Sequence, residues 1–261
     1  YPPGIKRVVF GSGAGYKRPP VVDANWQIYC VRGPRTAAML KVEASLAITD
    51  SAALVAALPW DRCERKYDVS YMPHHYSAAL GDWRSVCDRA GLNYINPSAH
   101  VETTIERIRQ SNLLITEALH GAVVADALRV PWIAVRAYGH ILPLKWHDWC
   151  ESLGMAYRPT RLPSLWQTPL TVTNRVRHLA KRFGSYIPGG KEKWRWSPVR
   201  SHGERRIECI AVELARLATG NVAQLSRDET HESILTRLTT KLEELKNDYA
   251  PSGSAQSRVA A

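Results

Sequence analysis

Apolar and polar residues follow two different periods along the first part of the chain. Short, nearly continuous apolar runs are typical of buried parallel strands, and apolar residues three and four apart are typical of helices. The runs that predict strands are Arg7–Phe10, Gln27–Val31, Leu46–Thr49, Tyr67–Met72, Asn93–Ile95, Asn112–Thr116 and Pro131–Val135. The stretches that predict helices are Pro34–Val42, Ser51–Leu58, Ala79–Ala90, His100–Gln110 and Gly121–Arg129. This alternation favours an α/β fold with a parallel, doubly wound sheet.

A polar seam divides this series. Residues 59–66 (PWDRCERK) are mostly charged and separate two strand–helix units. We therefore predict an N-terminal half at residues 1–65 and a second half at 66–156. Residues 157–250 would form a basic irregular segment followed by C-terminal helices at Arg205–Thr219 and Glu229–Asn247, and residues 251–261 a disordered tail.

Composition indicates an intracellular globular protein. The chain has 261 residues, 45% of them apolar, which suffices for a substantial core. No apolar run is long enough to span a bilayer, and the first residues carry no secretory pattern, so we expect a cytoplasmic location. The five cysteines are scattered and contain no C-x-x-C pair, which indicates reduced thiols.

The formal charge of +11 is concentrated in one segment. Residues 157–206 hold twelve lysines and arginines against two glutamates. Such a segment indicates an anionic partner, which could be nucleic acid, acidic lipid headgroups or an acidic substrate.

A glycine-rich turn follows the first predicted strand. In Gly11-Ser12-Gly13-Ala14-Gly15, backbone N–H groups could approach a phosphate. A dinucleotide fingerprint is excluded, because the following Pro19-Pro20 forbids a helix interior and the next strand ends in Arg32 rather than in an acidic residue. A tight turn and a ligand loop both stay open.

Charged residues follow the next strands at the edge where open parallel sheets bind ligands. Arg32 and Arg35 flank a helix start and predict an anion site. Asp50 and Ser51 end the following predicted strand in the same way, and an N-cap is the simplest interpretation of Asp50. After the strand Tyr67–Met72, His74 could face the cleft, or it and its neighbour His75 could be ordinary surface residues.

The most specific stretch is Leu113–Val135, a compact strand–helix–strand unit. Glu117 and His120 fall where the strand passes into the helix, and Gly121 removes a side chain at that point. A histidine beside a carboxylate and a helix start is a candidate for acid–base chemistry. We expect no metal, because the spacing of His140, His147 and Cys150 matches no common zinc site.

These motifs resemble the polysaccharide pyruvyl transferase family, in particular its exopolysaccharide ketal-pyruvate branch. The resemblance covers roughly Lys6 to Gly154 and centres on Leu119-His120-Gly121, with Arg32 to Thr36, Asp50-Ser51 and the glycine turn in support. It implies a GT-B-like fold, in which two Rossmann-like halves face a cleft. Two features differ from the family pattern: Ala118 stands where many members have arginine, and the usual opening Gly-Asp segment is absent before Tyr1. We therefore expect an incomplete N-terminal half.

The resemblance also implies the chemistry. Phosphoenolpyruvate would be the donor, held by Arg32 and Arg35, with Gly11, Ser12, Gly13, Asp50, Ser51, His74, Leu119 and Gly121 as further substrate-binding candidates. His120 would be the acid–base group, and Glu117 would orient it or take part directly. No metal or redox cofactor is needed.

The resemblance implies a sugar on a lipid-linked oligosaccharide as acceptor, which favours peripheral contact of residues 157–206 with an anionic membrane at its inner face. Two other functions stay open: a GT-B glycosyltransferase that uses a nucleotide sugar, and a non-catalytic nucleic-acid binder, although no nucleic-acid motif is present.

Overall fold

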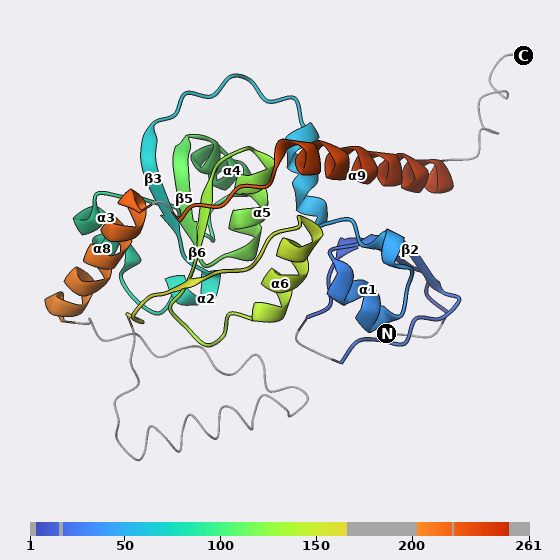
Figure 1. Cartoon of the computed structure of the whole chain (residues 1–261), viewed down its shortest axis with the longest axis horizontal. Helices are drawn as coiled ribbons and strands as arrows, with labels where there is room; N and C mark the ends of the chain where they lie inside the picture. Colours follow the sequence, from blue (N-terminus) through green and yellow to red (C-terminus); the bar gives the residue numbers. More distant parts are fainter. Residues whose placement is uncertain (1–3, 16–17, 166–202, 221, 251–261) are drawn as a thin grey trace, which may run out of the picture.

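Two parallel sheets organise the computed structural model, which describes residues 4–15, 18–165, 203–220 and 222–250 (Figure 1). The small sheet pairs β1 (Arg7–Ser12) with β2 (Trp26–Val31). The large sheet has the order β4-β3-β5-β6-β7, and all its strand pairs are parallel. Its strands are β3 (Tyr67–Met72), β4 (Asn93–Tyr94), β5 (Ser111–Thr116), β6 (Trp132–Arg136) and β7 (Thr160–Arg161). The predicted α/β class with parallel sheets is confirmed.

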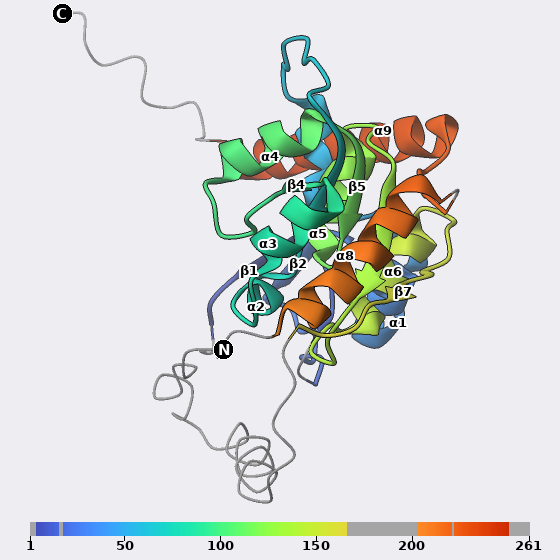
Figure 2. The same ribbon diagram turned by 90° about the vertical axis from the view of Figure 1, so that its left-hand side faces the viewer.

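Helices cover both faces of the large sheet (Figure 2). One face packs against α3 (Trp83–Ala90) and α8 (Glu204–Thr219), and the other against α4 (Val101–Arg109), α5 (Leu119–Ala127) and α6 (Pro143–Ser152). Successive strand residues point to opposite faces of the sheet. Ile115 and Ile133 therefore pack on the face covered by α3 and α8, and Leu114 and Trp132 on the face covered by α4, α5 and α6. Both faces are buried, which explains why these strands are continuously apolar.

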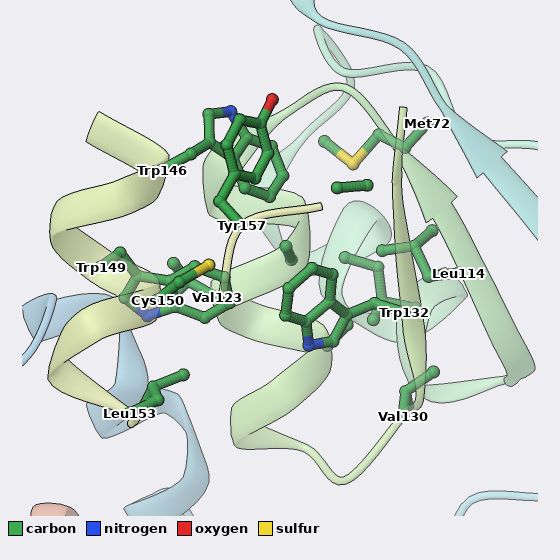
Figure 3. Close-up of a cluster of buried hydrophobic side chains, with 14 of the residues drawn as sticks. Met72, Leu114, Val123, Val130, Trp132, Trp146, Trp149, Cys150, Leu153 and Tyr157 are labelled. Carbon is green, nitrogen blue, oxygen red and sulfur yellow. The ribbon is translucent and has the colours of Figure 1, made fainter. Parts of the chain in front are cut away.

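Three tryptophans fix α6 against the large sheet (Figure 3). The ring of Trp132 lies 6.2 Å from that of Trp146 and 5.2 Å from that of Trp149, and all three side chains are buried. Tyr157 stacks on Trp146 at 5.0 Å. Aromatic contacts of this kind stabilise beyond the apolar area that they bury, so α6 is held in a defined position.

The small sheet is flanked by α1 (Pro34–Leu40), by the 3-10 helix η2 (Ser51–Ala57) and by the last helix, α9 (Asp228–Tyr249). The predicted strand Leu46–Thr49 is wrong. A 3-10 turn, η1 (Ala44–Leu46), occupies its start, and only a single bridge, from Val31 to Ala47, continues the sheet. The predicted helix at Ser51–Leu58 exists, but in the tighter 3-10 form.

Two predicted helices begin at clearly different residues in the structure, and two helices of the described residues were missed. The helix expected at Ala79–Ala90 begins only at Trp83, as α3, because the Asp82 side chain accepts a hydrogen bond from the Ser85 N–H and caps the helix start there. A short helix, α2 (His75–Ala78), precedes it and was not predicted. α5 begins two residues before the predicted Gly121, so His120 lies in its first turn. α6 was not predicted.

The two C-terminal helices are confirmed. α8 packs against α3 and buries four residues of one face, Ile207, Ile210, Leu214 and Leu217. α9 packs on η2 and β2 and buries Ile234 and Leu238 in the core. Most of the basic segment and the tail, residues 166–202 and 251–261, lie outside the described residues, so the predictions made for them stay predictions.

Candidate active site

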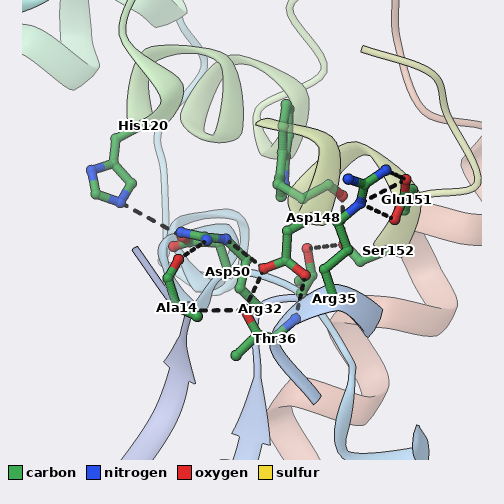
Figure 4. A network of polar contacts seen from close by, with 11 residues as sticks. Ala14, Arg32, Arg35, Thr36, Asp50, His120, Asp148, Glu151 and Ser152 are labelled. Carbon is green, nitrogen blue, oxygen red and sulfur yellow. Dashed lines mark hydrogen bonds and ion pairs between the residues drawn. The ribbon is translucent and has the colours of Figure 1, made fainter. Parts of the chain in front are cut away.

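The imidazole of His120 faces a carboxylate that comes from the other sheet (Figure 4). His120 lies in the first turn of α5, directly after β5, and Asp50 lies just after the bridge that extends the small sheet. The distance from His120 Nε2 to Asp50 Oδ2 is 3.6 Å. His120 is 73% exposed and Asp50 only 8%, so the ring is open to a substrate while its partner is fixed. The fold thus brings together two residues that the sequence predicted separately.

The two oxygens of Asp50 have different contacts. Oδ1 accepts a hydrogen bond from the Ala52 N–H at 3.1 Å, so Asp50 is the N-cap of η2, as the sequence predicted. Oδ2 faces His120. Burial alone would raise the pKa of Asp50, but His120, the Ala52 N–H and Arg32 outweigh it and hold the pKa below its usual value. The carboxylate is therefore charged and suited to stabilise an imidazolium opposite it.

Glu117 occupies a different position, beneath the ends of β3 and β6. Its side chain is fully buried, and Oε1 accepts a hydrogen bond from the Ala137 N–H at 2.5 Å. Oε2 is buried without a hydrogen bond of ordinary geometry among the described residues. Burial raises the pKa of Glu117, while Ser77 and nearby backbone N–H groups oppose that shift. The carboxylate that the structure places against His120 is thus Asp50, and the catalytic role suggested for Glu117 stays a prediction.

Arg32 lies in a buried polar network between the sheets (Figure 4). Its Nε donates to Asp148 Oδ2 at 3.1 Å, and one terminal nitrogen donates to the Ala14 carbonyl at 3.1 Å. Asp148 also accepts hydrogen bonds from the N–H and the hydroxyl of Thr36, at 2.9 and 2.6 Å. A Cβ at Gly13 would lie 2.1 Å from the guanidinium carbon of Arg32, so this position of the turn needs glycine for close approach.

Arg35 forms an exposed ion pair one helical turn away. Its guanidinium contacts both oxygens of Glu151, with the Nε at 3.0 and 2.9 Å. Both predicted arginines therefore have carboxylate partners on α6, a helix that the sequence did not predict. Their role as donor ligands stays a prediction.

Three further predicted residues lie at the end of β1 and at the start of α5. Gly11 packs against Ser51, at the start of η2, where an added Cβ would lie 2.4 Å from the Ser51 nitrogen. The carbonyl of Ser12, at the end of β1, accepts a hydrogen bond from the Arg32 N–H at 3.1 Å. Leu119, the first residue of α5, is partly buried and packs against the core.

An apolar cavity of about 570 Å³ opens beside His120. It lies between η2, α4 and α5, and Ser51, His120 and Gly121 contribute to its lining. A Cβ at Gly121 would meet Thr116 Oγ1 at 2.9 Å and Met72 Sδ at 3.0 Å, so this glycine lets α5 begin close against the sheet.

A cluster of rings lies in the segments that follow β3 and β6. The ring of His74 lies 4.2 Å from that of His75 and 5.1 Å from that of His140, and Tyr138 stacks on His140 at 5.5 Å. His74 also caps α2 through its ring nitrogen, which accepts from the Tyr76 N–H. Among the described residues, no group of three or more His, Cys, Asp or Glu side chains is arranged to hold a metal ion.

His74 should make the stability of the protein depend on pH. Burial, and then the charges of His75, His140 and Lys145, lower the pKa of His74 to about 4 from its ordinary value of 6.5. Between these pH values the unfolded chain binds a proton that the native ring does not, so the free energy of unfolding should fall as the pH falls from about 6.5 to about 4. The measurement is denaturant unfolding across this range, for the wild type and for His74→Asn, in which asparagine can still cap α2.

The His74→Asn variant should lose less stability on acidification than the wild type. His100 is exposed, so the control variant His100→Asn should behave like the wild type. The raised pKa of Glu117 gives a dependence of opposite sign, but it is present in all three proteins. An identical pH dependence in wild type and His74→Asn would contradict the expectation.

Sequence reasoning missed Asp148 and Lys145, both on α6. A signal was present: Trp146, Trp149, Cys150 and Leu153 follow helical spacing after Pro143, which is well suited to the first turn of a helix. None of the helices among the described residues is both long and apolar enough to cross a membrane.

Comparison with known proteins agrees with the predicted family. The family model described as polysaccharide pyruvyl transferase matches residues 2–138, which include both sheets up to β6 and end before α6. The chain therefore belongs to the polysaccharide pyruvyl transferase family and is a transferase enzyme.

Among curated proteins, the chain is similar to the succinoglycan biosynthesis protein ExoV of Rhizobium meliloti (strain 1021). The two are 34% identical over 266 residues, which cover 95% of this chain and 84% of the relative. No solved structure matches the chain significantly.

Proposed function

We propose that this enzyme transfers the pyruvyl group of phosphoenolpyruvate onto a sugar of an exopolysaccharide precursor as a ketal. Family membership supports pyruvyl transfer to a polysaccharide, and the similarity to a succinoglycan biosynthesis protein supports a polysaccharide precursor as acceptor. The single observation that carries the assignment of the site is the exposed imidazole of His120, whose Nε2 faces the buried carboxylate of Asp50.

The pair can perform the acid–base steps that ketal formation needs. Protonated His120 would deliver a proton to the methylene carbon of the donor, which creates an oxocarbenium-like centre at the neighbouring carbon. One sugar hydroxyl adds to this centre, phosphate leaves, and a second hydroxyl adds. Of the two hydroxyl protons, one returns to the neutral imidazole and the other is taken up by the departing phosphate. Asp50 stabilises the imidazolium, since an opposite charge favours the charged form.

The arginines and the glycine turn would serve the donor. Arg32 lies under the turn and is 4% exposed, so it would act on an anion mainly by its charge and by holding Gly13 and Ala14 in place. Arg35 is exposed, although Glu151 already contacts it. The rings of His74, Tyr76 and His140 offer flat faces of the kind on which a sugar can stack.

The arrangement of two parallel sheets with a catalytic pair between them is the reason to propose a GT-B-like architecture with two Rossmann-like halves. We also propose a lipid-linked acceptor, a cytoplasmic location and peripheral contact with the inner membrane face through the basic segment. This segment lies mostly outside the described residues, so its sequence alone supports the contact.

The test is incubation of the protein with phosphoenolpyruvate and candidate lipid-linked oligosaccharides. Phosphate release should require the acceptor, and the product mass should increase by one pyruvyl ketal. A thermal-shift series with phosphoenolpyruvate and nucleotide sugars provides the comparison. Stabilisation by a nucleotide sugar and not by phosphoenolpyruvate would contradict the proposed donor.

A further inference from the structure

Lys145 brings a cation to the candidate active site from a helix outside the motifs identified in the sequence. It is the third residue of α6, which begins at Pro143 without a side-chain cap at its N-terminus. The lysine packs on the glycine turn: a Cβ at Gly15 would lie 3.1 Å from Lys145 Cε and 3.7 Å from Nζ. The turn therefore lies against two cationic side chains, with Gly13 on Arg32 and Gly15 on Lys145.

The charges around Lys145 come from both sheets. Arg32, at the end of β2, and Asp50, before η2, act on the charge of Lys145, and Lys145 in turn acts on His74, after β3. Lys145 thus lies among the residues that surround the His120–Asp50 pair.

Two cationic groups, the ammonium of Lys145 and the guanidinium of Arg32, lie against the same glycine turn. Burial and the charge of Arg32 lower the pKa of Lys145, and Asp50 offsets this only in part. An anion placed beside Lys145 would gain from both cations and would relieve their mutual repulsion.

We propose that Lys145 binds the phosphate group of the donor. This inference rests on the proposed function and adds a binding residue to it. A lysine ammonium is a compact cation suited to phosphate, and the N-terminus of α6, whose partial positive charge also favours an anion, lies within a turn of it. Two cations next to a glycine turn and a helix start form one phosphate-binding region.

The experiment measures binding to the whole protein by calorimetry with three probes: phosphoenolpyruvate, inorganic phosphate and pyruvate. Lys145→Met removes the charge and keeps most of the packing on Gly15, and Lys145→Arg keeps the charge. Lys66→Met is the matched control, because Lys66 is exposed and lies far from the site along β3. It precedes the first residue of this strand, whereas His74 follows the last one.

In Lys145→Met the dissociation constants for phosphoenolpyruvate and phosphate should rise roughly ten- to a hundredfold, the scale of one charge-assisted hydrogen bond. Pyruvate binding should change little, Lys145→Arg should recover part of the loss, and Lys66→Met should match the wild type. Thermal unfolding of each variant shows that the fold persists.

Two results separate the inference from the proposed function. If the wild type binds phosphoenolpyruvate and Lys145→Met binds it equally well, Lys145 is not a ligand and the proposed function stands. A loss confined to pyruvate would overturn the assignment to the phosphate. If the wild type binds a nucleotide sugar but not phosphoenolpyruvate, the proposed function fails and the inference fails with it.

Discussion

Replacement of His120 by alanine should lower pyruvyl transfer by roughly a hundredfold or more, the usual scale for removal of a positioned acid–base group. The fold should survive, because the His120 side chain is 73% exposed and contributes little to the core. The measurement is phosphate release in the presence of acceptor, together with the melting temperature of the variant. Donor binding should change much less than turnover, since the residues proposed to hold the donor are others.

Two further variants make the test of His120 specific. Asp50→Asn keeps an oxygen that can cap η2 but removes the charge opposite the imidazole, so it should lower kcat and change its pH profile. His100→Ala removes another exposed histidine, at the start of α4, and should leave transfer unchanged. Near-normal turnover in a folded His120→Ala protein would remove His120 from the mechanism.

Replacement of Asp148 by alanine should destabilise the protein by about 3–5 kcal/mol, because it leaves the guanidinium of Arg32 buried without its partner. The side chain of Arg32 is 5% exposed and that of Asp148 is 1% exposed. The substitution also removes the acceptor for both hydrogen bonds from Thr36. The free energy of unfolding, from denaturant titration, measures the effect.

The control lies on the same helix. Glu151 is three residues from Asp148 and pairs with Arg35, but both of these side chains are exposed, at 36% and 42%. Exposed pairs contribute less than about 1 kcal/mol, so Glu151→Ala should have a small effect. The double variant Arg32→Met, Asp148→Leu should be more stable than Asp148→Ala, since no unpaired charge remains. Equal losses of unfolding free energy for Asp148→Ala and Glu151→Ala would show that burial does not make the Arg32–Asp148 pair more important than the exposed one.

The large sheet could be predicted from sequence because its signals are local. Strands such as Leu113 to Thr116 are buried on both faces and therefore apolar without interruption, and Leu119-His120-Gly121 marks the start of α5. The strand expected at Leu46–Thr49 has the same local appearance. It fails because η1 takes its first residue and because only Ala47 bridges to Val31. Pairing depends on tertiary position, which a single run of residues does not reveal.

The site shows the same limit. His120 and Asp50 were each candidates, but the sequence offered Glu117 as the neighbouring carboxylate, since it is only three residues from His120. The turn after β5 sends Glu117 down into the core instead, and the fold brings Asp50 from the other sheet. The partners of Arg32 and Arg35 could not be predicted either, because both lie on α6 (residues 143–152), to which the sequence interpretation assigned no helix.

The packing of α6 gives the protein an optical reporter of its own. Trp146 and Trp149 lie on the same helix as Lys145 and Asp148, and their buried rings lie within 6.2 Å of Trp132. Indoles fixed this closely in a chiral core couple electronically and produce near-ultraviolet circular dichroism, which disappears when specific packing is lost. A shift of α6 against β6 would therefore change this spectrum without any label. The position of α6, which carries Asp148 of the polar network, can thus be monitored by near-ultraviolet circular dichroism in the unlabelled protein.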